Sequence, residues 1–113
     1  MKIINLNKNY ILADKIFLAD KFLARSIGLL SFKSLDKNQA MILRPSSSVH
    51  TFFMRFPIDV LFVDKNNSIV GIIRHMKPFR ITGVYLKSRF VIELPIGVID
   101  TTKTSVGDCL QIQ

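Results

Sequence analysis

Hydrophobic and polar residues alternate in short runs along most of this chain, a pattern typical of β-strands. The clearest runs are 58–64 and 68–76, which are separated by Lys65, Asn66 and Asn67. Polar turn residues between two apolar runs rich in Ile and Val predict a β-hairpin. Along 58–64 both alternating sets of side chains are largely apolar. We therefore expect this strand to be covered on both faces.

Shorter apolar runs predict the other strands. Residues 3–6 and 10–13 flank a polar stretch and predict a first hairpin. Pro57 fits poorly in a central ladder, so we expect a bend between the runs 49–54 and 58–64. The further strand candidates are 16–18, 40–43, 49–54, 84–86, 89–94 and 109–112, and 96–105 is ambiguous between a helical turn and a loop.

One segment, 21–30, predicts a helix. Asp20 before it is a suitable N-cap, because its carboxylate can accept hydrogen bonds from the free amides of a first helical turn. Apolar residues then recur at spacings that place them on one face. The whole pattern predicts one α+β domain over 1–113 that is rich in β-structure: a small barrel-like or strongly curved, mostly antiparallel sheet with one early helix.

Composition excludes several classes of protein. The chain is 49% hydrophobic with nine Phe, too apolar for a disordered chain, and charged residues interrupt it too often for a membrane span. One cysteine cannot form an internal disulfide, and two histidines without metal-ligand spacing lead us to expect no metal and no cofactor. The first ten residues lack the continuous apolar core of a signal peptide, so we expect a cytoplasmic protein.

The charge of the chain is strongly positive, with 16 basic and 8 acidic residues and a net charge of +8. No acidic residue lies between Asp64 and Glu93. A basic run of this kind can attract nucleic-acid phosphates, although a solvated loop has the same composition. The residues of this alternative site are Arg74, Lys77, Arg80, Lys87 and Arg89.

Two acids stand on strands that are otherwise apolar, Asp59 and Glu93. A buried carboxylate must be paired, hydrogen-bonded or neutralised. Asp59 is therefore either a carboxylate at the mouth of a pocket or a structural residue that binds backbone amides. Arg25, in the predicted helix, is a suitable counter-charge for either acid, since a guanidinium binds a carboxylate through two parallel hydrogen bonds.

His50 and Thr51 begin the run 49–54, at the expected rim of the sheet. Histidine can act as a proton shuttle near neutral pH, or it can be a hydrogen-bonded edge residue. The residues around it show no nucleophile motif.

Several blocks of the chain together resemble a known family. The segment VHTFFMRFPIDVLFVD, with ARSIGLL before it and VIELPIG and VGD after it, resembles domain of unknown function 192. The resemblance runs from Ala24 to the C-terminus, although Ala40 stands where glycine is common in the family. It implies a compact β-barrel-like fold with an early helix and no established reaction. The family pattern falls on Arg25, Gly28, Leu29, Met41, Thr51, Met54, Pro57, Asp59, Phe62, Glu93, Leu94, Gly97, Gly107 and Asp108.

These observations favour a non-enzymatic domain that binds a small polar ligand or a protein partner. Its candidate site places Arg25, His50, Thr51, Asp59 and Glu93 around one concavity. One alternative is a hydrolase-like or other acid–base enzyme that uses Asp59 or His50. The other is nucleic-acid binding through the basic segment from Arg74 to Arg89.

Overall fold

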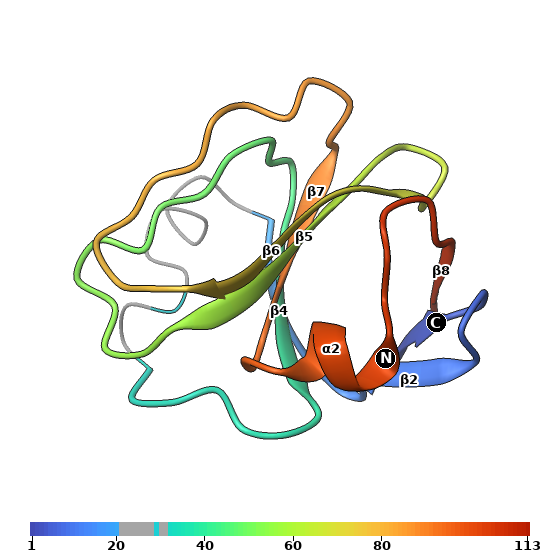
Figure 1. Ribbon diagram of the computed structural model, residues 1–113, viewed down its shortest axis with the longest axis horizontal. Helices are drawn as coiled ribbons and strands as arrows, with labels where there is room; N and C mark the ends of the chain where they lie inside the picture. Colours follow the sequence, from blue (N-terminus) through green and yellow to red (C-terminus); the bar gives the residue numbers. More distant parts are fainter. Residues whose placement is uncertain (21–28, 30–31) are drawn as a thin grey trace.

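The computed structural model describes residues 1–20, 29 and 32–113, and within them the chain forms a β-rich α+β fold. Five strands form one sheet in the order β3-β4-β7-β5-β6, and three form a second in the order β2-β1-β8 (Figure 1). The larger sheet contains β3 (Lys15–Ala19), β4 (Gln39–Leu43), β5 (Ile58–Val63), β6 (Ile69–Met76) and β7 (Phe90–Leu94). Its pairings are antiparallel except between β3 and β4.

The predicted hairpin of 58–64 and 68–76 is confirmed as the pair β5 and β6. Asp64 closes its turn, because its carboxylate accepts hydrogen bonds from the backbone amides of Asn66 and Ser68, both at 2.9 Å. Every residue of β5 is buried, as its apolar faces predict. The strand is covered on both sides.

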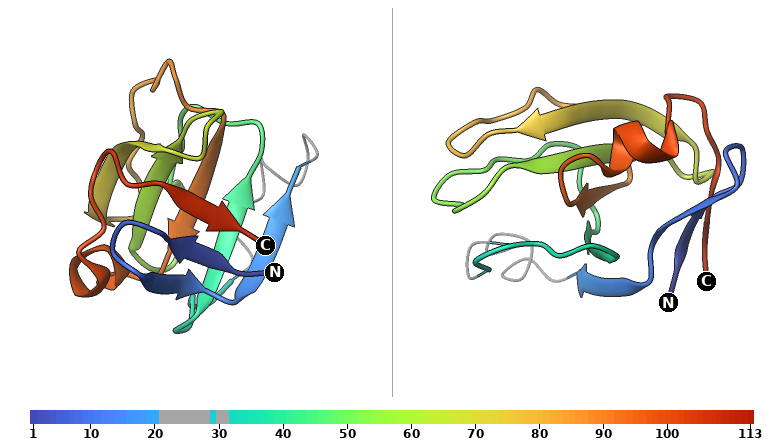
Figure 2. Two further views of the ribbon diagram at one scale, coloured as in Figure 1. Left: turned by 90° about the vertical axis from the view of Figure 1, so that its right-hand side faces the viewer. Right: turned by 60° about the horizontal axis from the view of Figure 1, so that its bottom comes forward.

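The smaller sheet joins the two ends of the chain. It contains β1 (Ile3–Asn5), β2 (Tyr10–Ala13) and β8 (Leu110–Ile112), and the predicted first hairpin is confirmed as β1 and β2. Lys2 and Gln113 exchange backbone hydrogen bonds beside the β1–β8 pair. Figure 2 shows both termini together next to one end of the larger sheet.

Two hydrophobic clusters lie on opposite faces of the larger sheet. The first fills the space toward the smaller sheet and the short helix α2 (Val98–Thr102), and includes Leu61, Val63 and Ile92. The second lies on the other face and includes Val60 and Val91. Successive side chains of a strand point to opposite faces, so β5 and β7 supply both clusters.

Some predicted elements differ from the structure. The runs 49–54 and 84–86 lie in loops, and an isolated bridge pairs His50 of the first run with Ile81. The ambiguous segment 96–105 contains α2. The strands form two sheets and do not close into a barrel. The predicted helix 21–30 lies outside the described residues except for Leu29, which is buried in the second cluster.

Candidate functional site

Asp59 is fully buried on β5 and binds three backbone amides. Its Oδ1 accepts a hydrogen bond at 2.9 Å from the N–H of His75, where β6 is bulged and His75 has a φ of 52°. A bulge removes an amide from regular pairing, and this carboxylate gives the amide a partner.

The other oxygen of Asp59 fastens α2. Its Oδ2 accepts hydrogen bonds from the N–H groups of Gly97 and Ile99, both at 3.1 Å. Gly97 is the N-cap residue and has no side chain to accept from the first turn, so Asp59 takes over that role from a neighbouring strand. Through these three hydrogen bonds Asp59 joins β5, β6 and α2, which is the geometry expected of an acid that binds backbone amides.

Glu93 lies on β7 and faces the second cluster, on the side of the sheet opposite Asp59. Its register neighbours are Met41 on β4 and Val60 on β5, and only 3% of the residue is exposed. Burial raises the pKa of Glu93 to about 8. The side chain is therefore mostly an uncharged carboxylic acid at neutral pH.

Thr51 is fully buried and joins two loops, 49–57 and 77–89. Its Oγ1 donates a hydrogen bond to the carbonyl of Lys77 at 2.6 Å and accepts one from the N–H of Arg80 at 3.0 Å. His50 beside it is exposed and stacks on Phe52, with ring centroids 5.3 Å apart. Both residues thus lie in the loops beyond the end of β6.

The structure does not gather the five predicted site residues around one concavity. His50 and Thr51 are neighbours, but Asp59 and Glu93 lie on opposite faces of the larger sheet. Asp59 shares its face with the side chains of the first cluster, and Glu93 shares its face with those of the second. Arg25 lies outside the described residues.

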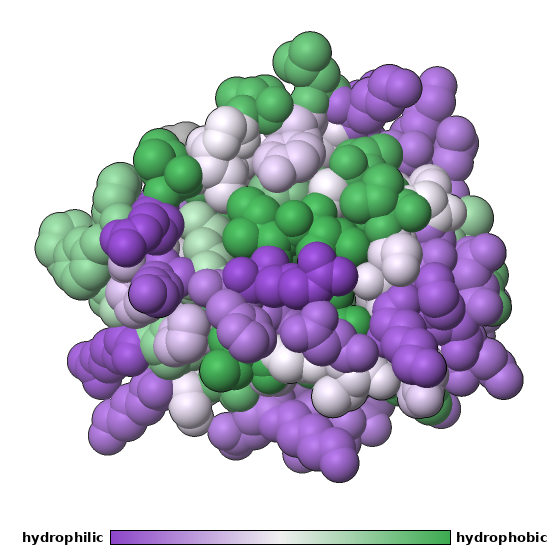
Figure 3. All heavy atoms as spheres, viewed as in Figure 1, coloured by the Kyte–Doolittle hydropathy of each residue, from purple (hydrophilic) through white to green (hydrophobic). Residues whose placement is uncertain are grey.

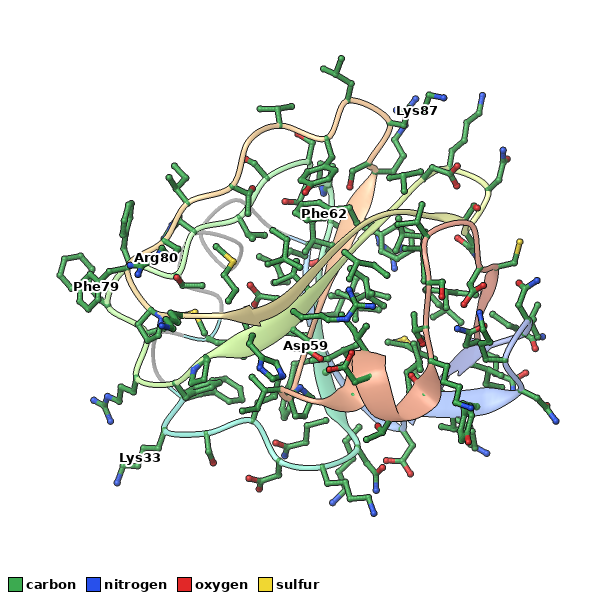
Figure 4. The ribbon with its side chains drawn as sticks, in the orientation of Figure 1. Lys33, Asp59, Phe62, Phe79, Arg80 and Lys87 are labelled. Carbon is green, nitrogen blue, oxygen red and sulfur yellow. The ribbon has the colours of Figure 1, made fainter. Side chains whose placement is uncertain are left out.

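The basic residues from Arg74 to Arg89 are divided among separate places. Arg74 forms an ion pair with Asp100, with Nε and Oδ1 2.8 Å apart. Arg74 also lines a hollow of about 400 Å³ together with Lys77 and Arg80, whereas Lys87 and Arg89 line another of about 420 Å³. Figure 4 shows Arg80 and Lys87 at different edges of the molecule.

A cleft of about 610 Å³ lies where β7 begins and the β5–β6 turn passes, and sequence reasoning did not find it. It adjoins the 420 Å³ hollow, since Asp64, Lys65 and Arg89 line both. We call the two together the basic cleft. The residues that line it are Arg44, Asp64, Lys65, Asn66, Asn67, Leu86, Lys87, Arg89, Phe90 and Ile112. Its cations come from three separate segments of the chain, so no local motif marks the cleft. The only sequence signal for it is the lack of acidic residues near Arg44 and Arg89.

A second feature that the sequence did not reveal is a group of exposed apolar side chains at the loop ends. Phe53 and Phe79 contact each other edge to face, with ring centroids 5.6 Å apart. We call the group Phe52, Phe53, Phe79 and Ile81 the aromatic tip; all four side chains are exposed. Figure 3 shows apolar atoms beside strongly polar ones at the edge where Figure 4 places Phe79 and Arg80.

Comparison with known proteins places the chain in a family. The model of DUF192, which is described as an uncharacterised ACR, matches residues 3–112. This chain belongs to the DUF192 family. It is 36% identical to a UPF0127 protein of Pyrococcus horikoshii over 94% of each chain. It is 32% identical to a UPF0127 protein of Thermococcus sibiricus, over 94% of this chain and 71% of the relative.

Two solved structures share the fold of this DUF192 protein. A protein of unknown function from Novosphingobium aromaticivorans superposes with a TM-score of 0.85 and 16% identity, over 98% of this chain and 82% of that one. A Sinorhizobium meliloti protein, whose name suggests a transcription regulator, gives a TM-score of 0.83 and 20% identity, over 97% and 89% of the two chains. At these identities the likeness shows the fold alone.

Two other features are absent from the described part of the chain. No three His, Cys, Asp or Glu side chains there are grouped so that they could hold a metal ion. No helix among the same residues is long and apolar enough to cross a membrane.

Proposed function

We propose that this DUF192 protein is a non-enzymatic domain that binds a small anionic ligand in the basic cleft. The observation that carries the proposal is the convergence of Arg44, Lys65, Lys87 and Arg89 on connected hollows with one acid, Asp64. Cations at the wall of a concave site favour carboxylate and phosphate groups.

The one acid in the cleft, Asp64, already accepts hydrogen bonds from backbone amides of the protein. Asp64 Oδ1 accepts hydrogen bonds from Asn66 and Ser68, which fixes the carboxylate against the turn. Arg44 lies over the Phe90 ring, with its guanidinium carbon 5.5 Å from the ring centroid. The cleft therefore combines a net positive charge, an aromatic wall and the Asn67 side chain, a polar group that can orient a ligand.

Binding is favoured over acid–base catalysis by the state of the two candidate catalytic residues. The carboxylate of Asp59 is buried and holds three backbone amides. His50 is exposed beside Phe52 and is not among the residues that line the basic cleft. A general acid or base must lie within hydrogen-bond reach of a bound substrate.

The test is calorimetric titration with inorganic phosphate, pyrophosphate and citrate at low ionic strength. We expect pyrophosphate or citrate to bind more tightly than phosphate, because more of the cations can contact a longer anion. The Lys65→Gln/Arg89→Gln variant should bind at least about tenfold more weakly. The control, Lys2→Gln/Lys33→Gln, removes the same charge outside the cleft and should bind like the wild type. Equal binding by both variants, or no binding of any anion, would contradict the proposal.

Nucleic-acid binding remains the alternative, suggested by the basic segment and by the name of the Sinorhizobium meliloti protein. The division of the basic residues argues for a compact ligand over a continuous phosphate track. Titration of a labelled single-stranded RNA at two salt concentrations distinguishes the two, because phosphate-driven affinity falls as salt rises. RNA binding much tighter than pyrophosphate binding would replace the small anion by a nucleic acid.

A further inference from the structure

We infer that the aromatic tip docks the protein on an anionic membrane surface. The tip is separate from the basic cleft, so this inference does not rest on the proposed function. It starts from the backbone of two residues. Phe53 and Phe79 have φ values of 65° and 62°, a left-handed conformation that is rare for bulky side chains.

Burial of the two rings does not offset the energetic cost of this backbone conformation. Phe53 is 75% exposed and Phe79 is 56% exposed, so both rings stay largely in water. A strained backbone persists only where surrounding contacts impose it, and such residues gather at functional sites. An exposed apolar group on a strained backbone indicates an interaction surface.

Thr51 is the residue that imposes the arrangement. Its carbonyl accepts hydrogen bonds from the N–H groups of Phe79 at 2.9 Å and Met54 at 3.2 Å, and its own N–H donates to the carbonyl of Arg80 at 2.8 Å. With the two hydroxyl bonds to the same loop, these contacts fix the loops side by side. The rings of Phe53 and Phe79 are therefore held outward before any partner arrives.

The charges around the tip identify the kind of partner. Lys77 and Arg80 flank Phe79 in the chain, Arg55 follows Phe53 by two positions, and all three are exposed. Neither 44–58 nor 65–92 contains an acidic residue. Apolar rings surrounded by cations match a bilayer surface, where anionic headgroups lie above hydrocarbon.

Two features favour a membrane over a nucleic acid. Ile81, which is 70% exposed, is an aliphatic member of the tip and offers no ring on which a base could stack. Figure 4 shows Phe79 projecting at the outer end of its loop, where a fluid bilayer can receive it without a matching groove.

The experiment is co-sedimentation of the whole chain with vesicles of phosphatidylcholine, with and without phosphatidylglycerol. We expect binding only to the anionic vesicles, and weaker binding as salt rises. The Phe53→Ser/Phe79→Ser variant should lose at least about tenfold in affinity. The Phe53→Leu/Phe79→Leu variant keeps apolar side chains and should retain most of the binding. Circular dichroism of each variant checks that it folds.

A matched control removes two exposed apolar residues elsewhere. Leu6 follows β1 and Val106 precedes β8, and both side chains are exposed. Both strands belong to the smaller sheet, which lies on the right in Figure 1, away from the end of β6. The Leu6→Ser/Val106→Ser variant should bind the anionic vesicles like the wild type. If it loses as much affinity as the tip variant, or if the wild type binds neither kind of vesicle, the inference is wrong.

Fluorescence gives an independent measure of insertion, because the chain contains no tryptophan. The emission of a Phe53→Trp variant should shift to the blue with anionic vesicles, whereas that of a Leu6→Trp variant should not. An unshifted spectrum during binding would overturn insertion of the tip. Binding of single-stranded RNA by the wild type, lost in the tip variant and without vesicle binding, would assign the tip to nucleic acid instead.

Discussion

Asp59 and Ile99 are 40 positions apart, yet the Asp59 Oδ2 accepts a hydrogen bond from the Ile99 N–H at 3.1 Å. The contact replaces an N-cap side chain that Gly97 cannot supply. Because the other oxygen binds the bulge at His75, one carboxylate joins the turn before α2 to the end of the β5–β6 hairpin. These three amide partners account for a buried acid on an apolar strand.

Replacement of Asp59 should therefore destabilise the fold. Asp59→Ala leaves three buried or half-buried amides without their partner, and each such loss costs roughly 1–3 kcal/mol. Asp59→Asn keeps one acceptor but turns an NH₂ group toward N–H donors. We expect both variants to lower the melting temperature by about 10 °C or more, measured by circular dichroism.

The control for this prediction is Asp100→Asn. That acid is exposed and paired with Arg74 at the surface, where an ion pair contributes about 0–1 kcal/mol. Its melting temperature should stay close to that of the wild type. If Asp59→Asn changed the melting temperature as little as Asp100→Asn but abolished anion binding, Asp59 would have a role in binding and not in stability.

The contrast between Asp59 and the loops shows what the sequence could predict. An acid among apolar strand residues can be recognised from the sequence as a residue that needs partners, because a buried charge is costly without them. Two of its three partners lie 38 and 40 positions away in a segment that the sequence left ambiguous, so local pattern did not identify them. The β5–β6 hairpin was predictable because its strands and turn are contiguous in the chain.

The run 49–54 illustrates the opposite case. Phe52 and Phe53 have the hydrophobicity of core residues, and a hydrophobic pattern does not distinguish a buried strand from an exposed loop. The deciding contacts come from Thr51 to Lys77 and Arg80, on a different loop. The basic cleft could not be predicted from the sequence for the same reason, since Arg44, Lys65 and Arg89 come together only in the folded chain.

Glu93 predicts a dependence of stability on pH. Its pKa rises from 4.5 to about 8 on burial, so the folded state holds a proton that the unfolded state releases between these values. The folded state therefore loses stability as pH rises from about 4.5 to about 8, and the loss levels off above that range. At pH 7 the linked cost is of the order of 3 kcal/mol.

Glu93→Gln removes this titration and preserves the shape of the side chain. We expect the variant to resemble the wild type near pH 5 and to be more stable at pH 7 and above, by an amount that grows with pH. Urea unfolding at a series of pH values measures the difference. A difference that stays constant from about pH 5 to about pH 9 would show that Glu93 does not carry the pH dependence.

Gly71 on β6 predicts a sharp steric requirement for the loop 77–89. A Cβ at Gly71 would overlap Cε2 of Tyr85 and lie 3.2 Å from a ring carbon of Phe62. Tyr85 stacks on Phe62 with ring centroids 3.8 Å apart, so the glycine leaves space for the ring that anchors the loop to the sheet. Gly71→Ala should displace Tyr85 and cost about 1–3 kcal/mol, measured by urea unfolding. Gly83→Ala is the control in the same loop, because a Cβ there meets nothing within 4 Å and should be neutral or slightly stabilising. Equal effects at the two glycines would mean that Tyr85 does not depend on this space.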